Sequence, residues 1–132
     1  MRIDLSGRSA LVTGSTRGIG RGIAQALSES GANVAVVGRD RSKAEEAAGS
    51  LENARGFSCD VSDVAAVTAL VEEVEKAFGA VDILVNNAGI TRDNLLMRIK
   101  DEDWDAVLNA NLKAAFVAIR AASRGWSSTD AA

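Results

Sequence analysis

The 132-residue sequence contains no histidine, no tyrosine and no proline, and Cys59 is its single cysteine. General acid–base catalysis near neutral pH most often uses histidine, with tyrosine among its substitutes, so two common proton-transfer groups are excluded. A lone cysteine cannot form an internal disulfide, which favours a reducing compartment such as the cytoplasm. No cluster with the spacing of metal ligands occurs, and we expect no metal site.

Long hydrophobic runs are also missing. No apolar stretch approaches the roughly 18 residues that span a bilayer, and the N-terminus lacks the basic-then-apolar layout of a signal peptide. The net charge of −3 argues against a nucleic-acid surface, which needs a basic face. With 47% hydrophobic and 25% charged residues, the composition is that of one globular domain without membrane or nucleic-acid partners.

Short apolar runs alternate with segments of helical periodicity along the whole chain. This alternation predicts an α/β fold with a parallel sheet, because each helical crossover is long enough to bring the next strand alongside in parallel. The nearly all-apolar strands indicate a four-stranded doubly wound sheet with helices on both faces. The expected strands are 9–13, 33–37, 54–58 and 81–85, and the expected helices are 18–29, 41–51, 63–78 and 101–123.

Helix ends and apolar faces follow from the same pattern. Ser62 is predicted as the N-cap of the third helix, and Gly79 as its end. The first helix is expected to use an apolar face of Ile19, Ile23, Ala26 and Leu27. The last helix is expected to use a stripe of Trp104, Val107, Leu108, Leu112, Ala115, Phe116 and Ile119.

The stretch TGSTRGIG (13–20) joins the first strand to the first helix. Free amides at a helix N-terminus, together with the helix dipole, attract a pyrophosphate, and glycines let it approach the backbone. A glycine turn can also be purely structural. The following strand–helix–strand context nevertheless favours dinucleotide binding.

The spacing Gly14-x-x-x-Gly18-x-Gly20, with NNAG (86–89) after the fourth strand, resembles the short-chain dehydrogenase/reductase family. Within that family, residues 86–112 closely resemble the 3-oxoacyl-[acyl-carrier-protein] reductases, and the likeness extends over about residues 3–124. The resemblance implies half of a Rossmann fold with strand order 3-2-1-4. It also implies cofactor contacts along the turn, at Gly14, Ser15, Thr16, Arg17, Gly18, Ile19 and Gly20.

The charge after the second strand bears on which dinucleotide binds. NAD-binding folds place an acidic residue there to hold the ribose 2′-hydroxyl. In this sequence that position is Gly38, followed by Arg39. Arg39 and Arg17 could hold a 2′-phosphate, so NADP(H) is preferred over NAD(H), although both could be ordinary surface arginines.

Further cofactor residues are implied by the resemblance alone. Asp60 and Val61 would flank the adenine, and Asn87, Ala88 and Gly89 would line the path of the ribose and nicotinamide. Structural alternatives remain open, since Asp60 could cap the turn before the next helix. Asn87 could likewise tie strand ends together.

The family's catalytic serine, tyrosine and lysine have no counterpart in the 132 residues, and only Asn111 matches its catalytic asparagine. The acidic residues of 101–105 read as solvated charges at a helix start. We therefore expect an NADP(H)-binding half-domain that is inactive as a reductase by itself. The alternative is an oxidoreductase that reduces 3-oxoacyl thioesters with NADPH only when a C-terminal half complements it. A chain that folds and has no function is a third possibility.

The resemblance ends near residue 124. Residues 1–124 are expected to form the truncated dinucleotide-binding domain, and residues 125–132 a divergent, disordered tail. An apolar edge strand at 81–85 and an apolar stripe on helix 101–123 would be left uncovered. A homodimer or larger homo-oligomer through either element is the expected consequence.

Overall fold

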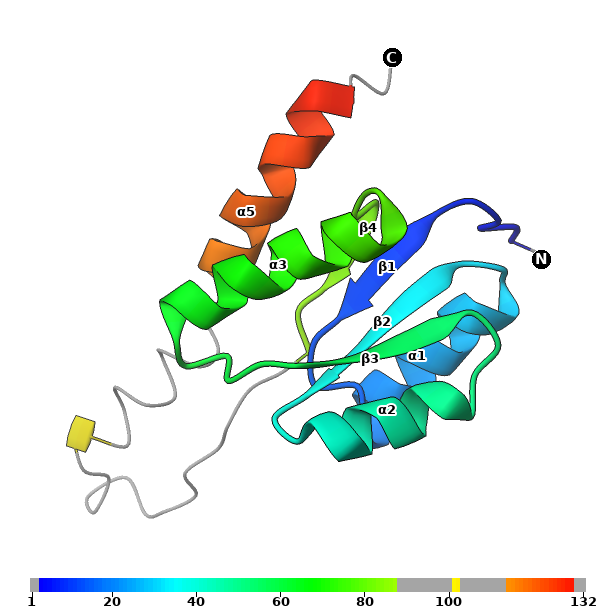
Figure 1. Ribbon diagram of the computed structural model, residues 1–132, viewed down its shortest axis with the longest axis horizontal. Coiled ribbons are helices and arrows are strands. Elements are labelled where there is room, and N and C mark those ends of the chain that lie inside the picture. Colours follow the sequence, from blue (N-terminus) through cyan, green and yellow to red (C-terminus); the bar gives the residue numbers. More distant parts are fainter. Residues whose placement is uncertain (1–2, 88–100, 103–113, 130–132) are drawn as a thin grey trace.

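The structure is a computed structural model that describes residues 3–87, 101–102 and 114–129. Its strands form one parallel sheet in the order β3-β2-β1-β4 (Figure 1). The predicted strand order and the parallel pairing are confirmed. The strands are β1 (Ser9–Val12), β2 (Asn33–Gly38), β3 (Ala54–Ser58) and β4 (Ile83–Val85).

Helices cover both faces of this sheet. Figure 1 shows α1 and α2 on one face and α3 and α5 on the other, as the doubly wound prediction requires. The helices are α1 (Gly18–Glu29), α2 (Arg41–Gly49), α3 (Val64–Phe78) and α5 (Ala114–Thr129). The part of the predicted last helix between 103 and 113 lies outside the described residues.

Two apolar cores lie on the two faces of the sheet, because successive strand side chains alternate in direction. In β2, Val34 and Val36 belong to the core under α1 and α2, whereas Ala35 and Val37 belong to the core under α3 and α5. The α1/α2 side is lined by small helix residues, which lets those helices lie close to the strands. The helix residues buried in that core are Ala24, Ala47 and Ala48.

The N-termini of α2 and α3 are capped by aspartates. Asp40 accepts from the amide of Ser42, and Asp63 accepts from the amides of Ala65 and Ala66. The prediction that Ser62 caps α3 is therefore wrong. Ser62 instead donates its amide and its hydroxyl to Oδ1 of Asp60 and so belongs to the turn that precedes α3.

The predicted apolar face of α1 is displaced. Ile19 is 79% exposed and Ala26 is exposed, while Gly20, Ala24 and Ser28 form the buried face. Small residues at the contact bring the helix axis close to the sheet, and the larger Ile23 and Leu27 pack only at its margin.

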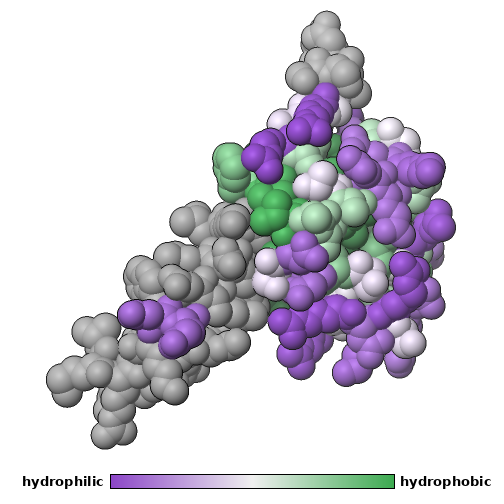
Figure 2. Space-filling view, turned by 60° about the vertical axis from the view of Figure 1, so that its left-hand side comes forward, coloured by the Kyte–Doolittle hydropathy of each residue, from purple (hydrophilic) through white to green (hydrophobic). Residues whose placement is uncertain are grey.

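Four residues of the predicted last-helix stripe lie outside the described residues, namely Trp104, Val107, Leu108 and Leu112. The part of the stripe within α5 is displaced as in α1. Val117, Ala118, Ala121 and Ala122 are buried in the core beside α3, whereas Phe116 and Ile119 are 59% and 47% exposed. Figure 2 shows apolar surface gathered on this side of the molecule. The helix α5 thus carries partly exposed apolar side chains outside the core.

The expected disorder after residue 124 is wrong for residues 125–129, because α5 continues to Thr129. The Trp126 indole donates to the carbonyl oxygen of Val81, just before β4. Gly125 lies against α3, where an added Cβ would stand 2.8 Å from Oε2 of Glu75. Residues 130–132 lie outside the described part of the chain.

Among the described residues, no helix combines the length and the apolar character needed to cross a membrane.

Candidate functional site

The β1–α1 turn lies at the carboxyl edge of the sheet, where the ends of β2 and β4 flank it. β1 pairs with β2 on one side and with β4 on the other, so the chain order reverses at this point. In open α/β sheets this reversal creates the crevice in which ligands bind. The backbone topology alone therefore predicts a ligand-binding crevice beside the β1–α1 turn.

Three glycines set the shape of the turn. Gly14 and Gly18 have φ values of +61° and +62°, in the left-handed region that favours glycine. Gly20 is constrained by space, because an added Cβ would overlap the Gly14 carbonyl oxygen and lie 2.5 Å from Nδ2 of Asn87. The beginning of α1 can therefore sit against the end of β1 only if residue 20 has no side chain.

Ser15 holds the turn to β2. Its amide donates to the carbonyl oxygen of Val37 at 2.9 Å, and its hydroxyl accepts from the Val37 amide at 2.8 Å. The same hydroxyl donates to the carbonyl oxygen of Val12 at 2.7 Å. Ser15 is completely buried, and both of its polar hydrogens are engaged inside the protein. Ser15 thus positions the turn in this structure, and its contact with a cofactor stays a prediction.

Thr13 and Asn87 tie the turn to β4. The Thr13 amide donates to the Val85 carbonyl oxygen, and the Asn87 amide donates to the Thr13 hydroxyl oxygen. The Asn87 side chain donates to the Gly14 carbonyl oxygen at 3.0 Å. The structural alternative for Asn87, a tie between strand ends, is confirmed, and its contact with a cofactor stays a prediction. Thr13 was missed by the sequence argument, since a threonine at a strand end has no distinctive signal.

The N-terminus of α1 differs from those of α2 and α3, because no side chain caps it. The amides of Gly18, Ile19 and Gly20 have no acceptor within the helix, as in any first turn. These donors and the positive end of the helix dipole attract an anion, and the absence of side chains at 18 and 20 lets it approach. The residues present therefore fit the pyrophosphate of a dinucleotide.

The second part of the candidate site lies where β2 and β3 end. Arg39 is exposed directly after Gly38, and Asp60 is exposed after β3. Two hydrogen bonds from Ser62 lower the pKa of the Asp60 carboxyl, and the positive charge of Arg39 lowers it further. The structural alternative for Asp60, capping of the turn before α3, is confirmed by these two hydrogen bonds. The adenine contact of Asp60 stays a prediction.

The residues on either side of Asp60 along the chain, Cys59 and Val61, pack into the core beside α3. Val61 is half-buried and packs against the α3 core. Burial, together with the negative charges of Asp60, Asp63 and Glu73, raises the pKa of the Cys59 thiol to about 11. The thiol is therefore neutral at physiological pH and is not an activated nucleophile. Ala88, Gly89 and Asn111 lie outside the described residues.

The strand order and the glycine turn after β1 are the architecture of a dinucleotide-binding α/β fold. The sequence matches the short chain dehydrogenase family over residues 8–131, and the chain belongs to this family.

Individual relatives of known name show which members of the family this chain is similar to. The chain is 47% identical over 126 residues to the 3-oxoacyl-[acyl-carrier-protein] reductase of Vibrio harveyi, covering 93% of this chain and 51% of the relative. It is 44% identical over 123 residues to the corresponding reductase of Escherichia coli K12, covering 92% and 50%. The chain therefore spans about half the length of the curated relatives it matches.

Solved structures agree with the fold. A structure from Sinorhizobium meliloti 1021 assigned to the short-chain alcohol dehydrogenases has a TM-score of 0.92 at 38% identity, covering 98% of this chain and 53% of that one. A short chain dehydrogenase from Burkholderia cenocepacia J2315, solved in complex with NADP, has a TM-score of 0.87 at 41% identity, covering 92% and 51%. The four-stranded half of the family fold is therefore present.

Proposed function

We propose that this chain is the NADP(H)-binding half of a short-chain dehydrogenase of the 3-oxoacyl-[acyl-carrier-protein] reductase type. The observation that carries the proposal is the uncapped N-terminus of α1 inside a turn where Gly20 leaves no room for a side chain. The relatives named as these reductases and the similar structure in complex with NADP support it.

The proposed binding follows the carboxyl edge of the sheet. The α1 end would hold the pyrophosphate, through Gly14, Thr16, Arg17, Gly18, Ile19 and Gly20. Arg17 and Arg39 would hold the 2′-phosphate, and Asp60 and Val61 would flank the adenine. Asn87, Ala88 and Gly89 would line the ribose and nicotinamide. When bound, NADPH supplies a hydride for reduction of a ketone; the residues of this chain bind and orient it.

We further propose that the 132-residue chain by itself does not turn over substrate. It contains no tyrosine to donate the proton, and Asn111 alone matches the family's catalytic set. The test is NADPH oxidation with a 3-oxoacyl thioester. No turnover is expected, whereas turnover by the pure chain would overturn the proposal. The alternative, activity complemented by a C-terminal half, is supported by the half-length match, and adding that half of a relative would test it.

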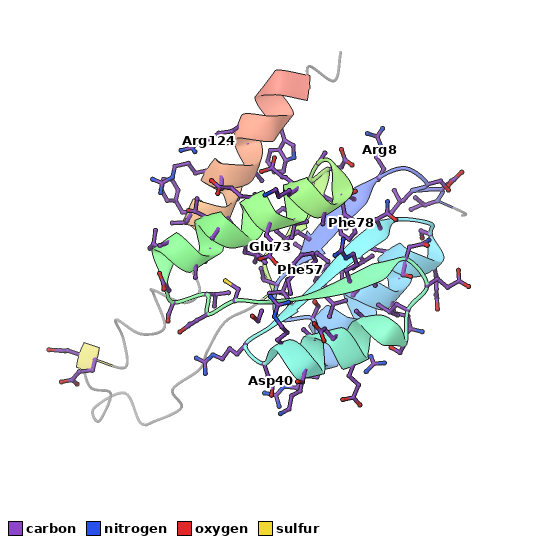
Figure 3. All side chains as sticks on the ribbon, viewed as in Figure 1. Arg8, Asp40, Phe57, Glu73, Phe78 and Arg124 are labelled. Carbon is purple, nitrogen blue, oxygen red and sulfur yellow. The ribbon has the colours of Figure 1, made fainter. Side chains whose placement is uncertain are left out.

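The cofactor preference is tested by replacing Arg39 with alanine. Loss of one charge-assisted contact should weaken NADPH binding by about tenfold, equal to about 1.4 kcal/mol, with little change for NADH. Calorimetric titration measures both affinities. The matched control is Arg8→Ala, because Arg8 is also exposed but lies before β1, at the edge of the sheet opposite the Asp40 turn (Figure 3). Equal losses for both cofactors, or an equal effect of Arg8→Ala, would contradict the assignment.

We propose that the chain also forms a homodimer. Phe116 and Ile119 expose apolar surface on α5, where Arg120 lies 5.2 Å from the Phe116 ring centre. Leu84 in β4 is only half-buried, and β4 pairs with β1 alone among the described strands. Uncovered apolar helix faces and strand edges both promote association.

Light scattering across protein concentrations measures this association. The wild type should show the molar mass of a dimer, and Phe116→Lys with Ile119→Lys should shift it toward that of a monomer if α5 is the interface. If the double variant remained dimeric, the interface would be the β4 edge and not α5. A monomeric wild type at all concentrations would overturn the dimer.

A further inference from the structure

The Thr16 side chain, in the glycine turn, fills the space beside Gly38 at the end of β2. An ideal Cβ built on Gly38 would stand 2.6 Å from Cγ2 of Thr16, closer than such atoms approach. The Gly38 backbone is not in the left-handed region, so the conformation alone would allow another residue there. Space, rather than backbone geometry, therefore disfavours a side chain at this position as long as the Thr16 methyl group stays where it is.

Neighbouring hydrogen bonds prevent the two segments from moving apart. Ser15 and Val37, the residues immediately before Thr16 and Gly38, exchange two hydrogen bonds of 2.8 and 2.9 Å. The Gly38 carbonyl oxygen also accepts from the Cys59 amide at 3.0 Å, which fixes the end of β2 against β3. The contact between Thr16 and position 38 can be relieved only by the Thr16 side chain itself.

Position 38 is where an NAD-binding dinucleotide fold places its acidic residue. We propose that Thr16 is a specificity-determining residue: its methyl group occupies the space that a side chain at position 38 needs, so that an acidic residue at position 38 can favour NAD(H) only when residue 16 is also made smaller. This inference rests on the proposed NADP(H) binding and adds a second residue to its specificity. Thr16 acts through position 38 and is thus a positioning residue in this respect.

Thr16→Ser and Thr16→Val form a matched pair for the test. Serine removes the γ-methyl and keeps the hydroxyl, whereas valine keeps a β-branched side chain and removes the hydroxyl. Each is combined with Gly38→Asp and compared with both single variants, which completes a double-mutant cycle. Calorimetric titration with NADH and NADPH and thermal unfolding without cofactor are measured for every variant.

Gly38→Asp alone is expected to lower Tm by about 4 °C and to bind both dinucleotides poorly, because the carboxylate is misplaced. Adding Thr16→Ser should restore Tm and tighten NADH binding by about tenfold relative to Gly38→Asp, whereas adding Thr16→Val should do neither.

Several results would overturn the inference. One is an unchanged Tm and good NADH binding for Gly38→Asp alone. Equal behaviour of the serine and valine double variants would also contradict it. If the wild type binds neither dinucleotide, the proposed function fails and the specificity role fails with it. The thermal cycle then still decides whether the steric contact exists, so the two failures are distinguishable.

Discussion

Replacing Gly20 with alanine is expected to destabilise the protein by about 3 kcal/mol and to weaken NADPH binding by about 100-fold. The added methyl group would overlap the carbonyl oxygen of Gly14 and approach the Asn87 side chain to 2.5 Å. Both partners are fixed, because Asn87 donates to that same Gly14 oxygen. The helix must therefore move away from β1, and the α1 amides move with it. Urea unfolding and calorimetric titration measure the two effects.

The control for this variant is Gly22→Ala in the same helix. An added Cβ at Gly22 meets no atom within 4 Å, so the same chemical change enters open space. Alanine in a helix interior should raise the unfolding free energy by about 0.5–1 kcal/mol, with NADPH binding unchanged. Similar destabilisation by both substitutions would show that helix propensity, and not the close approach of Gly20, dominates.

Replacing Gly56 in β3 with alanine is expected to lower the unfolding free energy by a similar amount. Its Cβ would lie 2.5 Å from the backbone nitrogen of Glu45 and 2.6 Å from the carbonyl carbon of Ala44, both in α2. Backbone atoms cannot rotate away as a side chain can, so α2 would have to separate from the sheet. We expect a loss of about 3 kcal/mol in unfolding free energy, measured by urea denaturation.

Gly49→Ala provides the matched control at the end of α2. Nothing lies within 4 Å of an added Cβ there, and its backbone φ is not positive. The unfolding free energy should stay within about 0.5 kcal/mol of the wild type or rise slightly. If Gly56→Ala were equally mild, the close packing of α2 on β3 would be refuted.

The two-sided arrangement of helices could be predicted from the alternation of strands and helices along the chain, and the strand order from the family resemblance. The buried faces of α1 and α5 could not be predicted in this way. Periodicity identifies which residues share a face, but the helix rotation is decided by the close approach of Gly20 in α1 and by Ala118, Ala121 and Ala122 in α5.

The other differences between prediction and structure concern hydrogen bonds, whose partners are distant in the sequence or are shared by adjacent candidates. Ser62 and Asp63 are adjacent candidates for one cap, and only the structure shows that Asp60 engages Ser62. Ser15 lies inside a phosphate-binding motif, but its hydroxyl accepts from Val37, 22 residues away. A small polar tail predicts disorder, yet one indole, that of Trp126, contacts Val81.

The central claim is that the β1–α1 turn binds NADP(H) in this chain. Calorimetric titration of NADPH and NADH into the wild-type 132-residue protein tests it most directly. We predict saturable binding of one NADPH per chain, about tenfold tighter than NADH, from the charge of the 2′-phosphate beside Arg17 and Arg39. No saturable binding of either dinucleotide would contradict the account.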